Sequence, residues 1–294
     1  MQTNMGFPTT PQTARLIEVA ETAFINAQIQ GVRQLFPNDR FLAKSIGGGV
    51  AAVTKPSFGR KLNHVAGFGM NGPVTDEDIE TIEQLFRAIA VPPEINLCPF
   101  ADPTVAPLLT ARGYKICAEM NVYALRLREY VVEERKLVMS EASITQSTDK
   151  QAQIVISQVS ENEKEQFVEQ STTGFQSGNP ESDLFLTLAA TASIRPDTRL
   201  YFARVNGQIA GTGGMALIPT PLGYVAELYI DSTVPEFRGK GVQAALLRAR
   251  LVEAKKCGCE LATVTTWPTG TSARNVERAG FELAYRKDVY TLYQ

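Results

Sequence analysis

The sequence has few of the residues that usually carry redox, metal or nucleophilic chemistry. Its 294 residues include four cysteines, one histidine and one tryptophan. Four scattered cysteines are too few for a disulfide framework. Cys257 and Cys259 are close together, but the histidine, His64, is far away in the sequence, so we interpret this pair as structural, at a helix end with Gly258 in the C′ role. We therefore expect no metal site.

Long hydrophobic runs and an excess of charge of one sign are also missing. No run approaches the ~18 apolar residues of a membrane span, and the N-terminus lacks a basic-then-apolar signal pattern. The formal net charge is −2, whereas nucleic-acid binders usually carry a basic excess. We expect a cytoplasmic protein whose partners include neither nucleic acid nor a membrane.

The chain carries the same order of parts twice, in residues 93–128 and 261–294. Each copy has a β-prone run ended by a proline, then a helix-like stretch, then a glycine followed by an aromatic residue. A tyrosine follows each glycine at the same distance. The pairs are Gly113 with Tyr123 and Gly280 with Tyr290. The equal offset favours duplication of one α/β unit over the general likeness of any two α/β halves.

A charged and then Ser/Thr-rich segment, 131–151, predicts a linker. It separates a first domain at 1–130 from a second at 152–294. In the first domain, apolar periodicity predicts helices at 13–30 and 76–90 and strands at 41–46, 49–54, 62–68 and 94–98. In the second, it predicts helices at 162–173, 184–192, 241–257 and 271–279, and strands at 154–159, 200–205, 208–217, 224–231, 261–266, 282–285 and 289–293.

The turn at Arg238-Gly239-Lys240-Gly241 is the strongest functional signal. It follows a β-prone run and leads into a helix, whose first turn has N–H groups without internal partners and a partial positive charge. Gly239 and Gly241 lack Cβ atoms, so a phosphate can approach the backbone closely. Arg238 and Lys240 add full charges. The pattern predicts a phosphorylated ligand, although glycines also mark ordinary turns.

The first half differs at the corresponding place. There, Thr75 is a predicted N-cap and Asp76, Glu77 and Asp78 fill the first helical turn. These carboxylates already complement the helix dipole and would repel a phosphate. We therefore expect the first half to lack an anion site and to serve as scaffold or as a wall of the substrate site.

The turn and its surroundings resemble a known family. Arg238-x-x-Gly241 between a strand and a helix, preceded by Pro235-Glu236-Phe237, resembles the acyl-CoA pyrophosphate loop of the GNAT superfamily of N-acetyltransferases. Val264-Thr265-Thr266, a short helix and Arg278-Ala279-Gly280-Phe281 are similar to the strand, helix and Gly-Phe turn that follow in that family. The resemblance covers about 152–294, and the first half resembles a degenerate copy.

The resemblance implies an α/β (α+β) fold of two tandem acyl-CoA N-acyltransferase-like domains. Each would be a mixed, mostly antiparallel sheet flanked by helices. The last position of the loop pattern, usually glycine or alanine, is Gln243 here. Its side chain could narrow the approach of the pyrophosphate or donate to a phosphate.

The resemblance also implies acetyl-CoA as the acyl donor. The pantetheine arm would pair with the backbone around Asp231, Ser232 and Thr233, where strands 224–231 and 261–266 separate. The pyrophosphate would be bound by the turn and the start of the helix. The residues implied there are Arg238, Gly239, Lys240, Gly241, Val242, Gln243 and Ala244. On the next helix, Ser272 and Asn275 either contact the cofactor or are helix-start and solvent residues.

The family's reaction needs no covalent acyl-enzyme, because a neutral amine attacks the thioester directly. Many members place an acid tyrosine at the position that is Val276 here. Glu227 is the candidate base, and a solvated strand carboxylate is the alternative. Tyr285 is a candidate acid, and Tyr290 another, although tyrosines on a closing strand are more often half-buried packing residues.

The leading hypothesis is an acetyl-CoA-dependent N-acetyltransferase that acts on a small-molecule or amino-acid-like amine. A catalytically silent acyl-CoA sensor or interaction protein is the alternative, motivated by Val276 and by the half that lacks the loop. A third hypothesis, transfer of an aminoacyl group to a peptide or cell-wall acceptor, would want a basic surface for tRNA, which the acidic composition does not favour. A homodimer is left open.

Overall fold

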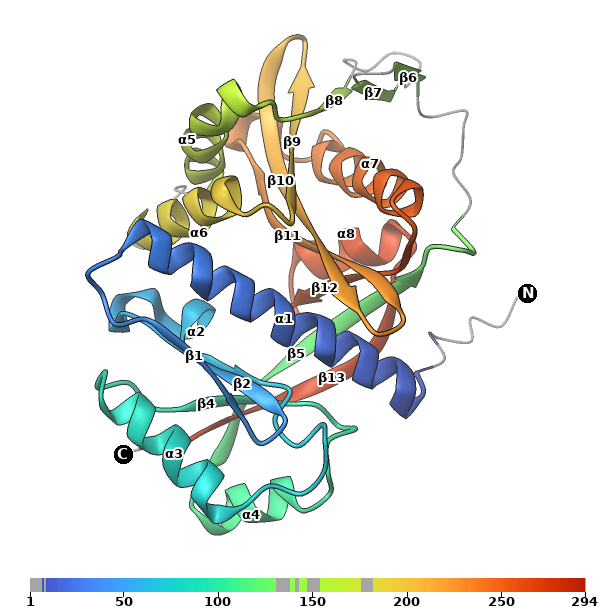
Figure 1. Cartoon of the computed structure of the whole chain (residues 1–294). Helices are drawn as coiled ribbons and strands as arrows, with labels where there is room; N and C mark the ends of the chain where they lie inside the picture. Colours follow the sequence, from blue (N-terminus) through green and yellow to red (C-terminus); the bar gives the residue numbers. More distant parts are fainter. Residues whose placement is uncertain are drawn as a thin grey trace. The chain divides into compact units, whose positions relative to one another are not determined.

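The structure is a computed structural model that describes residues 7, 9–130, 138–140, 143–146, 154–175 and 182–293. The chain divides into two compact units (Figure 1). The first comprises the chain up to Ala124 together with Thr265–Ala273 and the segment from Glu282 on. The second comprises Leu125–Val264 and Arg274–Phe281. The units therefore alternate along the C-terminal part of the chain.

The first unit contains a sheet with the strand order β1-β2-β3-β4-β13-β5. Its strands are β1 (Leu42–Ile46), β2 (Gly49–Val53), β3 (His64–Ala66), β4 (Glu94–Leu97), β13 (Glu282–Thr291) and β5 (Lys115–Arg126), whose last two residues pass into the second unit. Its helices are α1 (Pro11–Leu35), α2 (Gly59–Leu62), α3 (Asp76–Arg87) and α4 (Val105–Ala111). β3 and β4 are parallel, and the other pairs are antiparallel.

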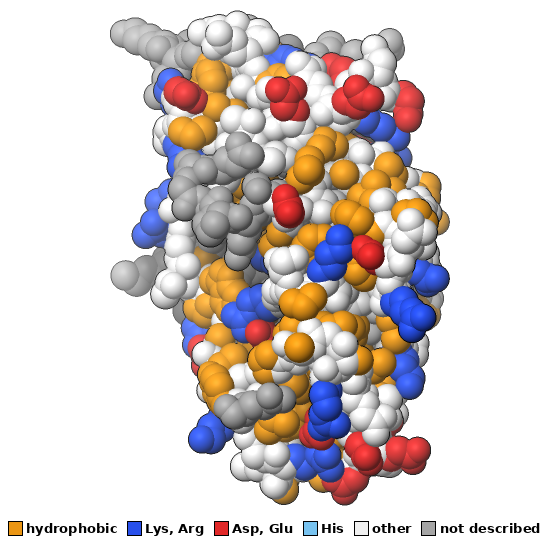
Figure 2. Space-filling model, turned by 90° about the vertical axis from the view of Figure 1, so that its left-hand side faces the viewer, with side chains coloured by type: hydrophobic (Ala, Val, Ile, Leu, Met, Phe, Trp, Pro, Cys, Tyr) orange, Lys and Arg blue, Asp and Glu red, His pale blue; other side chains and the backbone are white. Residues whose placement is uncertain are grey.

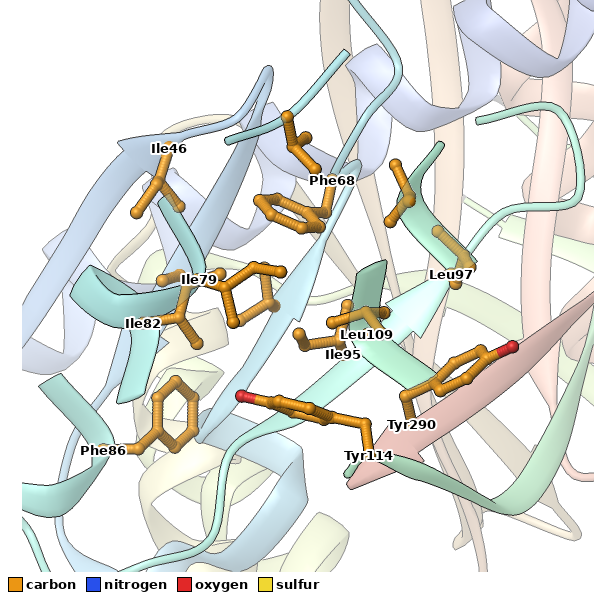
Figure 3. Close-up of a cluster of buried hydrophobic side chains, with 14 of the residues drawn as sticks. Ile46, Phe68, Ile79, Ile82, Phe86, Ile95, Leu97, Leu109, Tyr114 and Tyr290 are labelled. Carbon is orange, nitrogen blue, oxygen red and sulfur yellow. The ribbon is translucent and has the colours of Figure 1, made fainter. Parts of the chain in front are cut away.

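A compact apolar core holds α3 and α4 against this sheet (Figure 3). Ile79, Ile82 and Phe86 recur on one face of α3 at helical spacing and are completely buried. They meet strand residues such as Ile95 and Tyr290. Burying each such side chain stabilises the unit by about 1.5–3 kcal/mol relative to leaving it exposed.

The C-terminal strand of the chain, β13, lies inside the first unit. It pairs antiparallel with β4 on one side, where Tyr290 is opposite Ile95, and with β5 on the other. β13 comes from the second sequence repeat and β4 from the first. The duplicated halves therefore do not each keep their own last strand next to their own sheet.

A buried group of ionisable side chains joins β13 to α1. Lys287 is completely buried and pairs with Glu18, at 2.7 Å, and with Glu21. Burial alone would lower the pKa of the Lys287 ammonium, but the two carboxylates raise it overall, so the lysine stays charged. Tyr285 also donates to Glu18, at 2.7 Å. Since removing one member of such a group leaves a charge buried and unpaired, the group ties the two ends of the chain together.

The second unit contains a sheet with the strand order β12-β11-β10-β9-β8-β7-β6. Its strands are β6 (Val138–Ser140), β7 (Ser143–Gln146), β8 (Ile154–Gln158), β9 (Thr198–Val205), β10 (Gln208–Thr220), β11 (Gly223–Thr233) and β12 (Cys259–Thr266). Its helices are α5 (Lys164–Phe175), α6 (Ser182–Ile194) and α7 (Val242–Lys256), with α8 (Thr271–Arg278) divided between the units. Figure 1 shows α5 and α6 on one side of this sheet and α7 on the other.

These units confirm the predicted fold class, mixed sheets flanked by helices, and most predicted elements. Two expectations differ from the structure. The strands expected at 282–285 and 289–293 are one continuous strand, β13, with register shifts where it pairs with β5. The segment 131–151, expected to be a linker, contains β6 and β7, which pair with each other and continue onto β8. A Ser/Thr-rich composition suits both a linker and a short sheet-edge strand.

The surface in Figure 2 carries charges of both signs. Lys and Arg side chains are interspersed with Asp and Glu on that face, and neither sign gathers into one large field. Among the residues that the structure describes, no helix combines the length and the apolar character needed to cross a bilayer.

Candidate functional site

The glycine turn has the backbone conformation that its sequence predicts. A short 3₁₀ helix, Pro235–Phe237, precedes it, and α7 begins at Val242. Gly239 and Gly241 have φ of 76° and 84°, values that L side chains adopt only with strain. A Cβ at Gly239 would meet nothing within 4 Å, and one at Gly241 only Ile154 Cδ1, at 3.9 Å. Backbone conformation therefore requires the glycines, and the space beside them is open.

The N-terminus of α7 is not capped by a side chain. Gly241 is the N-cap residue, and the first turn contains no acidic residue. The Ala245 N–H donates to the Gly241 carbonyl at 3.0 Å and starts the helical ladder. The first-turn amides that precede it, those of Val242, Gln243 and Ala244, need a partner from outside the helix. This arrangement suits an anion.

Arg238 anchors the turn in addition to charging it. Its guanidinium donates to the carbonyl of Gly174 at 3.2 Å and to that of Thr233 at 3.4 Å. It thereby joins the end of α5 and the end of β11 to the turn. Lys240 is exposed, with its ammonium 5.1 Å from the centre of the Phe237 ring. Both cations thus lie at the turn, as predicted, and the role of Arg238 as an anchor was not foreseen.

Asn275 and Gln243, two residues that the sequence assigns to the cofactor, are hydrogen-bonded to each other. Asn275 Nδ2 donates to Gln243 Oε1 at 2.6 Å. This bond occupies Gln243 Oε1 and leaves Nε2 as the donor of the side chain. Both roles considered for Gln243 stay predictions. Ser272 is exposed on the part of α8 that belongs to the first unit. Val276, at the position of the family's acid, is buried at 1% exposure.

The strand before the turn carries a bulge, and its parallel partner separates from it. The register of β11 against β10 shifts between Thr212 and Gly214, and Ile230 has a φ of 52°. The pairing of β11 with β12 ends at Glu227 opposite Thr263. The predicted separation of these strands is confirmed. The backbone of β11 beyond Glu227 has no partner in β12 and can pair with an extended, amide-bearing ligand.

The side chains of the predicted pantetheine segment are used inside the protein. Asp231 pairs with Arg250 of α7, whose guanidinium is completely buried. Arg250 also donates to the carbonyl of Gly214 at 2.7 Å. Burial raises the pKa of Asp231 against the opposing effect of Arg250. The Ser232 hydroxyl meets that of Thr212 at 2.8 Å. The side chains of Asp231 and Ser232 are therefore occupied, which leaves the backbone as the group that a ligand would meet at these two residues.

The candidate base and the candidate acid lie in different units. Glu227 is half-buried on β11, and the Thr263 hydroxyl donates to its carboxylate. Tyr285 lies in the first unit at 6% exposure, where its hydroxyl is bound by Glu18 and burial raises its pKa well above the usual value. It is not among the residues that gather around the turn within the second unit. The role of Tyr285 as an acid stays a prediction.

Three residues near the turn and the separated strands have no role predicted from the sequence: Gly174, Arg250 and Thr263. Arg250 left a signal, since it stands on the apolar face of α7 that also carries Leu246, and a cation there needs a buried partner. No sequence pattern marks Gly174, because it is needed where the backbone of α5 comes close to Ser232. A Cβ at Gly174 would lie 2.5 Å from Ser232 Oγ.

The part of the chain that holds the glycine turn matches a known family. Residues 162–281 match the model of the acetyltransferase (GNAT) family. This part of the chain therefore forms a GNAT domain. The matched segment begins two residues before α5 and ends at Phe281, so it includes the separated strands, the glycine turn and α7. No curated protein matches the sequence.

Solved structures show that the likeness in fold extends along almost the whole chain. A GCN5-related N-acetyltransferase from Kribbella flavida is 19% identical, with a TM-score of 0.59 over 94% of this chain and 95% of that one. A tandem GNAT protein from the clavulanic acid biosynthesis pathway is 14% identical, with a TM-score of 0.55 over 95% and 94%. A functionally unknown conserved protein from Staphylococcus epidermidis is 11% identical, with a TM-score of 0.55 over 89% and 97%. At these identities the likeness concerns the fold, and it is compatible with the predicted two-domain architecture.

Proposed function

We propose that this GNAT protein is an acetyl-CoA-dependent N-acetyltransferase that acts on a small-molecule or amino-acid-like amine. The carrying observation is the uncapped N-terminus of α7 behind a turn with two glycines at positive φ. Family membership supports acyl transfer in general. The acetyl donor, the amine acceptor and the direct attack are our proposal.

The residues of the second unit fit an acyl-CoA in three places. The amides of residues 239–244 would bind the pyrophosphate, with Lys240 adding charge. The backbone of β11 around Asp231–Thr233 pairs with β10 on one side, and its other side would pair with the amides of the pantetheine arm. Bound acetyl-CoA would supply an activated acetyl thioester, whose acetyl group passes to the amine nitrogen as the C–S bond breaks.

Glu227 is the residue we propose to take the proton of the acceptor ammonium. It lies on β11 at the last pair before the strands separate, and it is half-buried, so water and a ligand can reach it. A base is needed because an amine is mostly protonated near neutral pH and only the neutral form attacks. The departing thiolate belongs to a group with a pKa of about 8.5, so it leaves without a strong acid. Buried Val276 at the acid position is therefore compatible with catalysis.

Calorimetry with acetyl-CoA, followed by thiol release against a panel of amines, tests the proposal. We expect binding at one site and thiol release with at least one amine. Absence of binding would contradict it. Binding without turnover on any acceptor would favour the alternative of an acyl-CoA sensor, for which the buried Val276 is the motivating observation.

A further inference from the structure

Glu227 and Thr263 form the last residue pair of two parallel strands. They face each other in register on β11 and β12, and the pairing of these strands ends with them. The Thr263 hydroxyl donates to Glu227 Oε2. Thr263 is 1% exposed, whereas Glu227 is half-buried. A buried donor thus holds a carboxylate that solvent can reach.

The polar neighbour of Glu227 on the same strand, Tyr229, has partners of its own. Tyr229, two residues further on the same strand, shares a hydrogen bond of 2.8 Å with Thr198 of β9. Arg195 lies 5.7 Å from the centre of the Tyr229 ring and pairs with Asp197 at 2.7 Å. Burial raises the pKa of Tyr229, and the charge of Glu227 adds to this effect. The donor from β12 is Thr263.

We infer that Thr263 is a positioning residue for the proposed base. Its hydroxyl fixes the Glu227 side chain at the point where β11 and β12 separate, and it favours the charged carboxylate that accepts the proton of the acceptor. A free glutamate side chain has several rotamers, and a single buried hydrogen bond selects one of them. The inference rests on the proposed function, because it assumes that Glu227 receives a proton.

The test compares Thr263→Val, which keeps the shape and removes the hydroxyl, with Thr263→Ser, which keeps the hydroxyl. The first readout is the titration of the Glu227 carboxyl carbon by NMR, assigned with Glu227→Gln. In Thr263→Val we expect the titration midpoint to move up by about one pH unit, because a donor to the charged form is lost. Thr263→Ser should titrate like the wild type. An unmoved midpoint in Thr263→Val would overturn the inference.

The second readout is the pH profile of kcat/KM with a responsive amine. In Thr263→Val we expect kcat to fall about tenfold and the acid limb to move to higher pH, with the KM for acetyl-CoA unchanged. A uniform loss with an unmoved limb would indicate a structural role only. If Thr263→Val does not fold, Thr263→Ala removes the hydroxyl by another route and the same outcomes apply. Failure of the proposed function appears separately, as absence of binding or of thiol release in the wild type, while the NMR titration still decides whether Thr263 positions Glu227.

Discussion

The N-termini of α3 and α7 occupy corresponding places in the two halves and have opposite chemistry. α3 is closed by a capping box, in which the Thr75 hydroxyl accepts from Asp78 N–H at 3.1 Å and Asp78 accepts from Thr75 N–H at 2.9 Å. α7 has a glycine N-cap and neither a capping side chain nor an acid in its first turn. The first-turn N–H groups of α3 are thus capped by its own side chains, whereas those of α7 are open to an external anion. The difference separates a helix that only supports the fold from one that can bind a ligand.

The two units also bury a cation in different ways. In the first, Lys287 pairs with Glu18 and Glu21 of α1 and so joins the last strand to the first helix. In the second, Arg250 pairs with Asp231 and joins α7 to the bulged strand beside the turn. The first arrangement stabilises a fold whose strands come from both ends of the chain. The second fixes the helix end relative to the strand that we expect to contact the ligand.

The largest expected effect is on stability and concerns Lys287. Lys287→Met leaves Glu18 and Glu21 buried without their partner, so we expect the free energy of unfolding to fall by about 3–5 kcal/mol. Acetyl-CoA affinity of the folded protein should change less than about threefold, because Lys287 lies outside the unit that holds the turn. Denaturant unfolding and calorimetry measure the two quantities. A loss of acetyl-CoA affinity with an unchanged free energy of unfolding would contradict a purely stabilising role of Lys287.

The next effect is on binding and concerns Gly241. Gly241→Glu places a carboxylate at the open helix end and a Cβ at a φ of 84°, so we expect acetyl-CoA affinity to fall at least about 100-fold. Gly72 is the matched control, since it lies shortly before α3, has a φ of 124° and has nothing within 4 Å of its Cβ position. Gly72→Glu should bind like the wild type. Equal losses in both variants would show that the turn is not the site.

A smaller effect should follow if α7 is given the capping residue of α3. Ala244→Asp puts a carboxylate at the third helical position, where α3 has Asp78. We expect acetyl-CoA affinity to fall about tenfold and helix stability to rise by about 0.3–1 kcal/mol, since the acid competes with the ligand for the helix end. Calorimetry and thermal unfolding measure both changes. Unchanged affinity would mean that the first-turn amides do not bind the ligand.

The smallest effect is the reverse change in the first unit. Asp78→Ala removes half of the capping box of α3, so we expect a loss of about 1 kcal/mol in stability. Acetyl-CoA affinity should stay at the wild-type value. A gain of a second binding site in this variant would show that carboxylates alone had closed a competent site in the first half.

Local features of this site were predictable from sequence because they depend on neighbouring residues. Gly239, Gly241 and the apolar spacing of α7 predict turn and helix directly, and Thr75 with Asp78 predicts the cap of α3. The pairing of β13 with β4 was not predictable. The alternation of apolar residues in 282–291 predicts a half-buried strand. It does not predict which strand lies beside it, so the pairing of Tyr290 with Ile95 could not be inferred.

Contacts between residues distant in the sequence could not be predicted either, because they depend on how the elements pack. Asn275 and Gln243 were each assigned to the cofactor, but their mutual hydrogen bond depends on how α8 packs beside α7. The sequence predicts Arg238 as a charged residue of the pyrophosphate loop but not its bond to Gly174, which needs the end of α5 to lie against β11. Tyr285 was named as an acid from its strand, and its contact with Glu18 depends on α1, at the other end of the chain.

The stoichiometry and site of acetyl-CoA binding test the central claim most directly. A calorimetric titration of the wild-type chain, repeated with Gly241→Glu, should give one site per chain that is lost in the variant. Two sites, or one site that survives in Gly241→Glu, would contradict the assignment of a single acyl-CoA site to the open end of α7.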